Sequence, residues 1–500
     1  MPDMSMVPVT LAAVDLGSNS FRLELATLQH GRYRRIDYLK ETVRLGGGLD
    51  ADGLLTEEAV ERGLTCLRRF AARLGGLPPA QVRAVATQTL REARNRNDFL
   101  LRAEAALGYP IEVISGREEA RLIYAGVAQL QPSDEARLVV DIGGRSTELI
   151  LGQGRTPQVA ESFAVGSVGL SMRFFGDGRF TPAAFRAAQV AAGAEFEEGL
   201  QTFRRERWQQ ALGSSGTVGA VASLLRDSGR GDGRISADNL RWCIERCLEA
   251  GRADRLELPG LRADRRPVIG GGLCILYTLA AQFGIDVLMP AKGALRQGVI
   301  VDLQQRRLSQ RKPSAGDLRD ASVAELQRRF AVDTAHAERV AAVAAALYQQ
   351  ACPGADAVAR RELRWACALH EMGQTVSHHD HHRHSAYLMA HVDAPGFSQS
   401  QQRRIGELVL GQRGGLRKIE QPLAQTGFAW QVLCLRLAVI ACHARLAVSP
   451  HELRLHPDGN QARLGWKAAW AAQHERTVFL LQEEALAWQR HGPLRLLLPA

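Results

Sequence analysis

The sequence predicts an α/β protein in which a mixed sheet is built twice, followed by an all-α domain and a small C-terminal α+β domain. Three observations support this fold class. Strand patterns alternate with helical patterns as far as about Leu303. A strand–glycine loop–strand pattern that begins at Leu11 begins again at Leu138. Helical patterns dominate beyond Asp317, until the alternating run Gln461–Trp466 indicates a strand near the C-terminus.

The first α/β domain is expected at residues 10–135. Strands are predicted at Leu11–Val14 and Phe21–Ala26, on either side of the first glycine-containing loop. A helix is predicted at Thr56–Leu74, because Thr56 can cap it, acidic residues follow in the first turn, and two glycines end it. Two further strands are predicted at Val82–Ala86 and Ile111–Ile114, each followed by a helical pattern.

The second α/β domain is expected at residues 136–305. Strands at Leu138–Val140 and Thr147–Leu151 flank the second glycine loop, so this loop also lies in a hairpin. The apolar segment Val268–Met289 contains three consecutive glycines and two polar residues. It therefore predicts a buried helix followed by a strand, and no membrane span.

A linker is predicted at residues 303–317, where the composition becomes polar and includes a Pro-Ser-Ala-Gly run. A capping box at Ser322–Glu325 then predicts a helix start, and an alanine-rich helix is predicted at Thr334–Gln350. The helical domain is expected at residues 318–445. The small domain is expected at residues 446–500, with a helix near Arg476–Arg490.

Composition and charge indicate a globular protein with a basic surface. The 500 residues are 46% hydrophobic and carry a net charge of +10, which favours polyanionic ligands. Nearly all basic residues are arginines, so genome composition explains the charge equally well. The eight cysteines form no C-x-x-C pair, which indicates a reducing compartment without disulfides. With no signal peptide, the chain is expected to be cytoplasmic, and peripheral membrane association is left open.

Two loops carry the chemistry. The first reads V-D-L-G-S-N-S at residues 14–20, and the second reads V-D-I-G-G-R-S-T-E at residues 140–148. Backbone N–H groups at such turns bind phosphate oxygens, and the aspartate beside them can hold Mg²⁺. Two loops of this kind predict paired domains that grip one phosphorylated ligand between them.

Two adjacent carboxylates, Glu118 and Glu119, begin a helix after the strand at Ile111–Ile114. The helix dipole favours negative charge there, so simple helix-end electrostatics is the weightier explanation from these residues alone. Adjacent residues on a helix point in different directions, so only one of the two can face a cleft.

The ordered series of motifs resembles the exopolyphosphatase/guanosine pentaphosphate phosphohydrolase family. The series runs D-L-G-S-N-S-F, T-x-T-L-R-E-A, S-G-R-E-E-A-R-L-I and D-I-G-G-x-S-T-E-L, then V-G-S-V-G-L, G-S-S-G-T and G-A-L-R-Q-G-V. The string H-R-H-S-A-Y at residues 382–387 is similar to the longer bacterial exopolyphosphatases. The resemblance covers nearly the whole chain.

The resemblance implies two actin-like, ribonuclease-H-like domains, an HD-like helical domain, and Mg²⁺-dependent removal of the terminal phosphate of polyphosphate. It implies that Glu119 is the general base and that Asp141 and Glu148 associate with the metal. Phosphate binding is implied for residues of both loops and of two further motifs: Asp15, Gly17, Ser18, Asn19, Ser20, Arg91, Gly143, Gly144, Ser146, Thr147, Gly213, Ser214, Ser215 and Gly216. A homodimer is also implied.

One position departs from the family pattern. Arg145 stands where the family usually has glycine or alanine, and we interpret it as a further phosphate contact, with a solvent-facing role as the alternative. It also requires a backbone there that does not need glycine.

Seven of the fourteen histidines lie between His370 and His391. An HD-type metal site needs a His-Asp pair, and the dipeptide here is His370-Glu371. A structural or polyanion-binding role is therefore favoured over a metal site. A basic track for the polymer is possible at Arg383, His384, Arg413, Arg417 and Lys418, with a solvated surface as the alternative.

The function that these features favour is processive exopolyphosphatase activity. Polymer contacts spread along a basic channel would favour long chains, and no specific nucleic acid is predicted as a partner. The alternatives are a guanosine pentaphosphate (pppGpp) 5′-phosphohydrolase, an ATPase or kinase with an adenine pocket near Gly270–Gly272, and a non-catalytic sensor.

Overall fold

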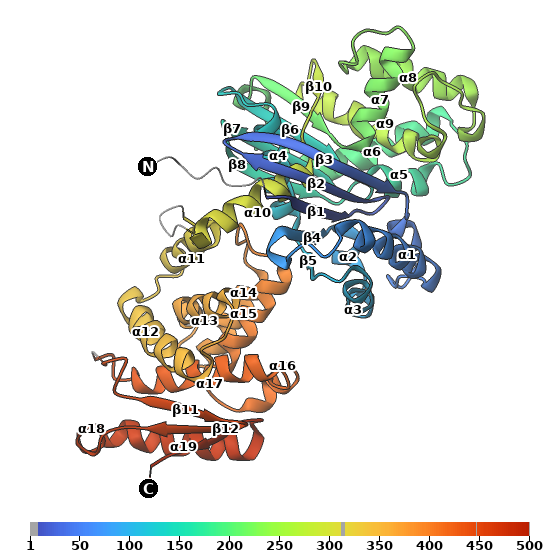
Figure 1. Cartoon of the computed structure of the whole chain (residues 1–500). Helices are drawn as coiled ribbons and strands as arrows, with labels where there is room; N and C mark the ends of the chain where they lie inside the picture. Colours follow the sequence, from blue (N-terminus) through green and yellow to red (C-terminus); the bar gives the residue numbers. More distant parts are fainter. Residues whose placement is uncertain (1–8, 312–315, 447, 500) are drawn as a thin grey trace, which may run out of the picture. The chain divides into compact units, whose positions relative to one another are not determined.

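The structure is a computed structural model that describes residues 9–311, 316–446 and 448–499. The chain divides into two compact units, Met1–Ala315 and Gly316–Ala500. Unit 1 contains two five-stranded sheets, and unit 2 contains a helical region and a three-stranded sheet (Figure 1).

The first sheet of unit 1 has the strand order β3-β2-β1-β4-β5. The first three strands form an antiparallel meander, and β4 and β5 run parallel to β1. The bounds are β1 (Leu11–Leu16), β2 (Phe21–Gln29), β3 (Arg32–Glu41), β4 (Val82–Ala86) and β5 (Ile111–Val113). The four predicted strands are confirmed, and β3 is an additional exposed edge strand.

The second sheet repeats this topology, with the order β8-β7-β6-β9-β10 and the same pattern of antiparallel and parallel pairs. Its bounds are β6 (Ala136–Ile142), β7 (Thr147–Gln153), β8 (Thr156–Phe163), β9 (Gln210–Ser214) and β10 (Leu288–Pro290). The predicted duplication is therefore confirmed, and each glycine loop joins the first two strands of its sheet. This is the sheet order of the expected ribonuclease-H-like pair.

The described residues of unit 1 form ten α-helices, some on the sheets and others, such as α6 and α8, on α9: α1 (Glu57–Leu74), α2 (Gln88–Glu92), α3 (Arg96–Leu107), α4 (Gly116–Leu130), α5 (Ser167–Phe174), α6 (Pro182–Phe196), α7 (Ser215–Asp227), α8 (Ala237–Ala250), α9 (Arg266–Phe283) and α10 (Leu295–Arg311). Helix α1 ends at Gly75 with φ 58°, as predicted, but the Thr56 side chain makes no capping hydrogen bond. The segment 268–289 forms most of α9 and then β10, which confirms the buried helix and strand.

Two helices are shared between the sheets. Helix α4 leaves the first sheet and packs on β7 and β8 of the second, whereas α10 leaves the second sheet and packs on β1 and β2 of the first. Their crossing is so close that a Cβ on Gly298 would lie 1.7 Å from the Leu122 carbonyl oxygen, and one on Gly126 would lie 2.2 Å from that of Ala294. Only glycine fits at this crossing, which joins the two α/β halves.

The linker predicted at residues 303–317 is wrong for its first part. Helix α10 continues to Arg311, because Leu303 is buried in the apolar cluster with β1 residues, Ser309 is also buried, and Arg306 pairs with Asp302 one turn away at 2.6 Å. Residues 312–315 of the predicted linker lie outside the described residues.

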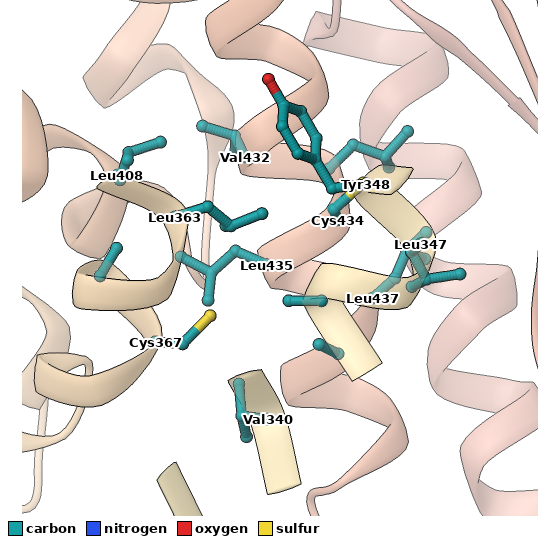
Figure 2. Close-up of a cluster of buried hydrophobic side chains, with 14 of the residues drawn as sticks. Val340, Leu347, Tyr348, Leu363, Cys367, Leu408, Val432, Cys434, Leu435 and Leu437 are labelled. Carbon is teal, nitrogen blue, oxygen red and sulfur yellow. The ribbon is translucent and has the colours of Figure 1, made fainter. Parts of the chain in front are cut away.

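The helical part of unit 2 packs around one apolar cluster, part of which is shown in Figure 2. Its α-helices are α11 (Leu318–Arg329), α12 (Thr334–Ala351), α13 (Ala357–Leu369), α14 (His381–His391), α15 (Gln399–Gly411), α16 (Glu420–Leu423) and α17 (Thr426–Ala441). The capping box predicted at Ser322 is wrong. Asp317 caps α11 earlier, and the Ser322 hydroxyl inside the helix donates to the Pro395 carbonyl at 2.7 Å.

The C-terminal strands and helices of unit 2 are β11 (Arg454–Asp458), β12 (Gln461–Gly465), α18 (Ala468–Gln473), α19 (Glu475–His491) and β13 (Arg495–Leu497). Their buried side chains belong to the same apolar cluster as the helices. The eight cysteines are free thiols, in agreement with the sequence. Within the described ranges, no helix combines the length and apolar character that crossing a membrane would require.

Candidate active site

Both glycine loops border one hollow of unit 1. The first loop follows β1 and the second joins β6 to β7. A Cβ on Gly144 would lie only 3.0 Å from the Cβ of Ser18, so the two loops approach each other closely. The hollow is lined by residues of both loops and their neighbours, including Asp15, Gly17, Ser18, Asn19, Ser20, Glu119, Asp141, Gly143, Gly144, Ser146, Ser215 and Gly216.

The second loop is a tight turn held from behind by α5. The Gly143 N–H donates to the Ser146 carbonyl at 2.8 Å, and the N–H groups of Ser167 and Val168 donate to the carbonyls of Gly143 and Gly144 at 2.9 and 2.8 Å. A Cβ on Gly166 would lie 2.3 Å from the backbone nitrogen of Arg145. The V-G-S-V-G-L motif therefore supports the backbone of the second loop, because its glycine allows the start of α5 to approach that loop closely.

The G-S-S-G motif has two separate roles. Gly213 lies inside β9, where a Cβ would meet Leu288 and Val218 at 2.8 Å, so this glycine serves packing. Ser215 adopts φ 95° at the turn into α7 and lines the hollow together with Gly216. The guanidinium of Arg265 covers Gly216 so closely that a Cβ there would lie 2.2 Å from Nη2.

Only one carboxylate of the pair at the start of α4 reaches the hollow. The Ser115 hydroxyl caps α4 by accepting the Glu118 N–H at 3.2 Å. The Glu118 side chain turns away and pairs with Arg121 at 2.7 Å. Glu119 points into the hollow, as expected for neighbouring positions on a helix.

The Glu119 carboxylate is buried beside a cation and two other acids. Its Oε2 lies 2.9 Å from Nη1 of Arg91. Burial raises the pKa of Glu119 to about 7; Arg91 opposes this shift, whereas the negative charges of Asp141 and Asp15 add to it. A carboxylate that titrates near neutral pH in a hollow has the acidity expected of a general base.

Asp141 and Glu148 face each other across the β6–β7 pair. Asp141 lines the hollow, whereas Glu148 is 1% exposed and accepts hydrogen bonds from the hydroxyls of Ser146 and Ser162 at 2.7 and 2.9 Å. Burial raises the pKa of Asp141, and burial with the charges of Glu119 and Asp141 raises that of Glu148 further.

Asp15 lies on the opposite wall of the hollow and is 3% exposed. Its Oδ2 lies 3.4 Å from Arg22 and 3.7 Å from Arg296. Arg296 is anchored in turn by the fully buried Glu24 at 3.3 Å. Arg296 of the G-A-L-R-Q-G motif in α10 therefore pairs with Asp15 of β1, and Gln297 of the same motif donates to Glu24 at 2.7 Å.

Some predicted phosphate-binding residues lie outside this lining. Arg91 is engaged with Glu119, and the Thr147 hydroxyl donates to the Val165 carbonyl at 2.6 Å. The Ser214 hydroxyl donates to the Gly293 carbonyl at 3.2 Å. Arg145 pairs with Glu92 at 2.7 Å and lines a neighbouring surface pocket, so its phosphate contact stays a prediction.

The sequence also matches known families. Residues 27–307 match the model of the Ppx/GppA phosphatase family, and residues 318–485 match that of Ppx/GppA phosphatase, domain III. The chain belongs to the Ppx/GppA phosphatase family. The family confirms the resemblance of the motif series, while the likeness to long exopolyphosphatases in particular stays a prediction.

Several solved structures are similar to part of this chain. An exopolyphosphatase-like protein is 27% identical with a TM-score of 0.53, over 60% of this chain and 99% of its own. The Aquifex aeolicus PPX-GPPA enzyme is 25% identical with a TM-score of 0.51, over 59% and 99%. An exopolyphosphatase from Cytophaga hutchinsonii, at 24% identity and a TM-score of 0.54 over 59% and 98%, supports the fold alone.

Several cations beside the hollow were not identified from the sequence. Arg22 and Arg265 line it, and Lys40 lies across from Arg22 in the β2–β3 pair. The pKa of Lys40 is lowered to about 8, mainly by burial and in addition by the charges of Arg265 and Arg22. The alternation along β2 and β3 could have placed Arg22 and Lys40 on one face, but nothing in the sequence brings Arg265 to them.

The residues of the predicted polymer track lie in unit 2. Arg413 and Arg417 are exposed, as is Arg383, and Lys418 donates to the Arg413 carbonyl at 2.5 Å. Burial lowers the pKa of Lys418 to about 8, and the charges of Arg436 and Arg383 contribute. His384 is half-buried in α14. The cations thus form a patch on unit 2.

The histidine-rich segment divides into exposed and buried members. His378, His379 and His391 are exposed. His370, His381 and His382 are buried, and burial lowers the pKa of His370 and of His382 to about 4. The buried members are therefore neutral at physiological pH and add no charge to the basic patch.

Proposed function

We propose that this protein is an exopolyphosphatase that releases orthophosphate from the end of inorganic polyphosphate. The observation that carries the proposal is Glu119, a buried carboxylate with a pKa of about 7 that faces two phosphate-binding loops in one hollow. Family membership supports phosphate-ester or anhydride chemistry. The choice of polyphosphate is our proposal.

In the proposed mechanism, Glu119 accepts a proton from a water molecule while the oxygen of that water attacks the terminal phosphorus. The phosphoanhydride P–O bond to the rest of the chain breaks, and the shortened polyphosphate leaves with the negative charge on its new terminal oxygen. General-base assistance of this kind typically contributes ~10²- to 10⁴-fold in rate. The backbone N–H groups and hydroxyls of the loops, among them Ser18, Asn19 and Ser146, hold the oxygens of the terminal phosphoryl group. Arg91 orients the Glu119 carboxylate and keeps its pKa from rising further.

The buried carboxylates fit a hydrated divalent cation. In addition to burial, the charges of Glu119 and Asp141 raise the pKa of Glu148, and the charge of Asp15 raises that of Asp141. A cation between these carboxylates and the substrate would relieve the repulsion. Mg²⁺ needs only one or two carboxylates in addition to substrate phosphates and water. When bound, Mg²⁺ would offset charge on the transferred phosphoryl group and its leaving oxygen.

The cations around the hollow support a polymeric anion. Besides burial, the charges of Arg265 and Arg22 help to lower the pKa of Lys40, and the charge of Arg22 helps to lower that of Arg265, so positive charge gathers beside the hollow. A polyphosphate segment that continues out of the hollow would neutralise this charge. Affinity that accumulates over several phosphates would fall with increasing salt.

A second candidate substrate is pppGpp, because an adjacent pocket has a different character. Ser18 and Asn19 also border this pocket, whose other walls include Met172, Phe175 and Val268. Apolar side chains next to a phosphate-binding loop suit a nucleoside base. The ATPase alternative would need an adenine pocket near Gly270–Gly272. These glycines instead pack α9 closely against neighbouring side chains and backbone.

The test measures phosphate release from long-chain polyphosphate and from pppGpp at the same Mg²⁺ concentration. The Glu119→Gln variant is the control for activity that does not depend on Glu119. The proposal expects the higher kcat/KM with polyphosphate, and polyphosphate still bound by the variant. A higher kcat/KM with pppGpp would transfer the proposal to the second candidate. Full activity of Glu119→Gln on both substrates would overturn the mechanism and favour a different site.

A further inference from the structure

Unit 2 contains a compact group of potential metal ligands. His336 lies in the first turn of α12, His370 ends α13, and Glu371 follows directly. One ligand atom from each of the three lies within 4.8 Å of the other two. Within the described residues, no other group of three His, Cys, Asp or Glu side chains has this spacing.

The two imidazoles are buried without being fully satisfied. His336 is 3% exposed and His370 is 1% exposed. Among the described residues, neither Nδ1 of His336 nor Nε2 of His370 has a hydrogen-bond partner. A buried polar atom without a partner costs free energy, so Nε2 of His370 in particular calls for a ligand. The nitrogen of His336 that lies 3.9 Å from Glu371 is Nε2.

The tautomer of His370 is set by its surroundings. Its Nδ1 lies 2.7 Å from the Cys367 carbonyl oxygen, which can only accept, so Nδ1 carries the proton and donates. The lone pair therefore remains on Nε2, the buried atom that lacks a partner. A histidine that donates one ring N–H to a backbone carbonyl and offers the other nitrogen is the usual arrangement of a metal ligand.

The carboxylate is also oriented. Arg445 donates to Oε1 and Oε2 of Glu371 at 2.8 and 2.9 Å, and its other nitrogen lies 3.0 Å from Asp333. The Glu371 Oε1 lies 3.9 Å from Nε2 of His336. Each carboxylate oxygen has two lone pairs, so an oxygen that accepts from Arg445 can still coordinate a cation.

From this arrangement we infer that His336, His370 and Glu371 form a binding site for Zn²⁺ in unit 2. Two imidazoles and one carboxylate suit zinc, whereas Mg²⁺ and Ca²⁺ require oxygen ligands. Ligand atoms of a tetrahedral zinc lie about 3.3 Å apart, so the three side chains move slightly inward when the ion binds. Three protein ligands leave a fourth position for water.

The site is independent of the proposed phosphatase reaction, because all three ligands belong to unit 2 and the hollow with Glu119 belongs to unit 1. Failure of the zinc inference would therefore leave the proposed function intact. Failure of the proposed function would likewise leave the zinc inference intact, since zinc binding can be measured without substrate.

The experiment uses the full-length chain, stripped with a chelator and then titrated with Zn²⁺ against a chromophoric competitor. Zinc content is measured in parallel by elemental analysis, and Co²⁺ replaces Zn²⁺ for a visible absorption spectrum. We expect one tight Zn²⁺ per chain and a tetrahedral Co²⁺ spectrum. His336→Gln and His370→Gln should each weaken Zn²⁺ binding at least about 100-fold.

The matched control is the double variant His378→Gln/His379→Gln, which removes two exposed histidines from the same histidine-rich segment. It should keep the tight site, which separates that site from weak surface binding. If the His370 variant does not fold, Glu371→Gln supplies the same test through the Co²⁺ spectrum. Absence of stoichiometric zinc in the wild type, or unchanged affinity in the folded ligand variants, would overturn the inference.

Discussion

Nη1 of Arg91 lies 2.9 Å from Oε2 of Glu119, and Glu119 lines a hollow together with Asp15 and Asp141. The arginine is thereby an opposing charge beside a carboxylate whose pKa is raised by burial and by its acidic neighbours. Its guanidinium is held from the other side by Gln88 at 2.6 Å. The acidity of the proposed base thus depends on a contact that the sequence suggested for phosphate.

Glu119→Gln should lower turnover of polyphosphate by ~10²- to 10⁴-fold, because the amide cannot accept the proton of the attacking water. Polymer affinity should be retained, as the loops are unchanged. The control is Glu118→Gln on the same helix turn, which loses ion pairs with Arg121 and Arg83 but does not face the hollow. That control should lower stability and leave kcat near wild type. Equal kcat losses in both variants would contradict the assignment.

Activity should fall as the pH decreases through about 7, because the base acts as a carboxylate and the pKa of Glu119 is about 7. Arg91 favours the charged form, so Arg91→Met should raise that pKa and move the acidic limb of the kcat profile to higher pH. Arg91→Lys keeps the positive charge and should shift the limb less. A profile of Arg91→Met that coincides with wild type would show that another group limits the rate.

Glu148→Gln should raise the melting temperature in the presence of a chelator, and more so at pH 8 than at pH 5. The pKa of Glu148 is raised in the folded state. As the pH rises above the unfolded pKa, the unfolded chain ionises first, which costs the wild type stability that glutamine does not lose. Scanning calorimetry at the two pH values measures this difference. Added Mg²⁺ should stabilise the wild type but not the variant if Glu148 takes part in metal binding.

Arg145→Ala distinguishes the predicted phosphate contact from the observed ion pair with Glu92. The pair is partly exposed, so its loss should cost no more than about 1 kcal/mol of stability. If Arg145 also binds phosphate, Arg145→Ala should raise KM for polyphosphate, whereas Glu92→Gln, which frees the guanidinium, should lower it or leave it unchanged. Equal KM values in the wild type and both variants would limit Arg145 to a structural role.

Gly298→Ala should destabilise unit 1 by about 1–3 kcal/mol or more, because the new methyl group would lie 1.7 Å from the Leu122 carbonyl oxygen at the α4–α10 crossing. Gly219→Ala in α7 is the matched control. It has nothing within 4 Å of the added Cβ and should stabilise by ~0.5–1 kcal/mol. Denaturant unfolding measures both. A neutral Gly298→Ala would mean that the two helices can separate without loss.

Much of the fold follows from local patterns. Strand β4 begins and ends at the predicted residues, and α1 and α12 do so within one residue, because alternation, helical spacing and caps act over a few neighbours. The linker at 303–311 and the Ser322 capping box were wrong for one physical reason. Burial against distant segments, β1 and β2 for α10 and Pro395 for Ser322, overrode the local signals.

The candidate site divides in the same way. The motif strings alone located both loops, and the helix geometry at Glu118 and Glu119 required that only one of them face the hollow. Whether Arg91 meets phosphate or carboxylate, and whether Arg145 meets phosphate or Glu92, was undecidable from sequence, because each guanidinium reaches partners far apart in the chain. His336 lies outside the histidine-rich segment, so its approach to His370 depends on how α12 packs against α13.

The sequence by itself determined the duplicated α/β architecture, the helical region after it, and the residue types of the two glycine loops. Local hydrogen bonding and periodic burial specify these features over short stretches of chain. Tertiary structure alone decided which charges share a low-dielectric space, namely Glu119 with Arg91, Asp15 and Asp141. Electrostatic energies depend on distance and burial in three dimensions, and no spacing along the chain determines either.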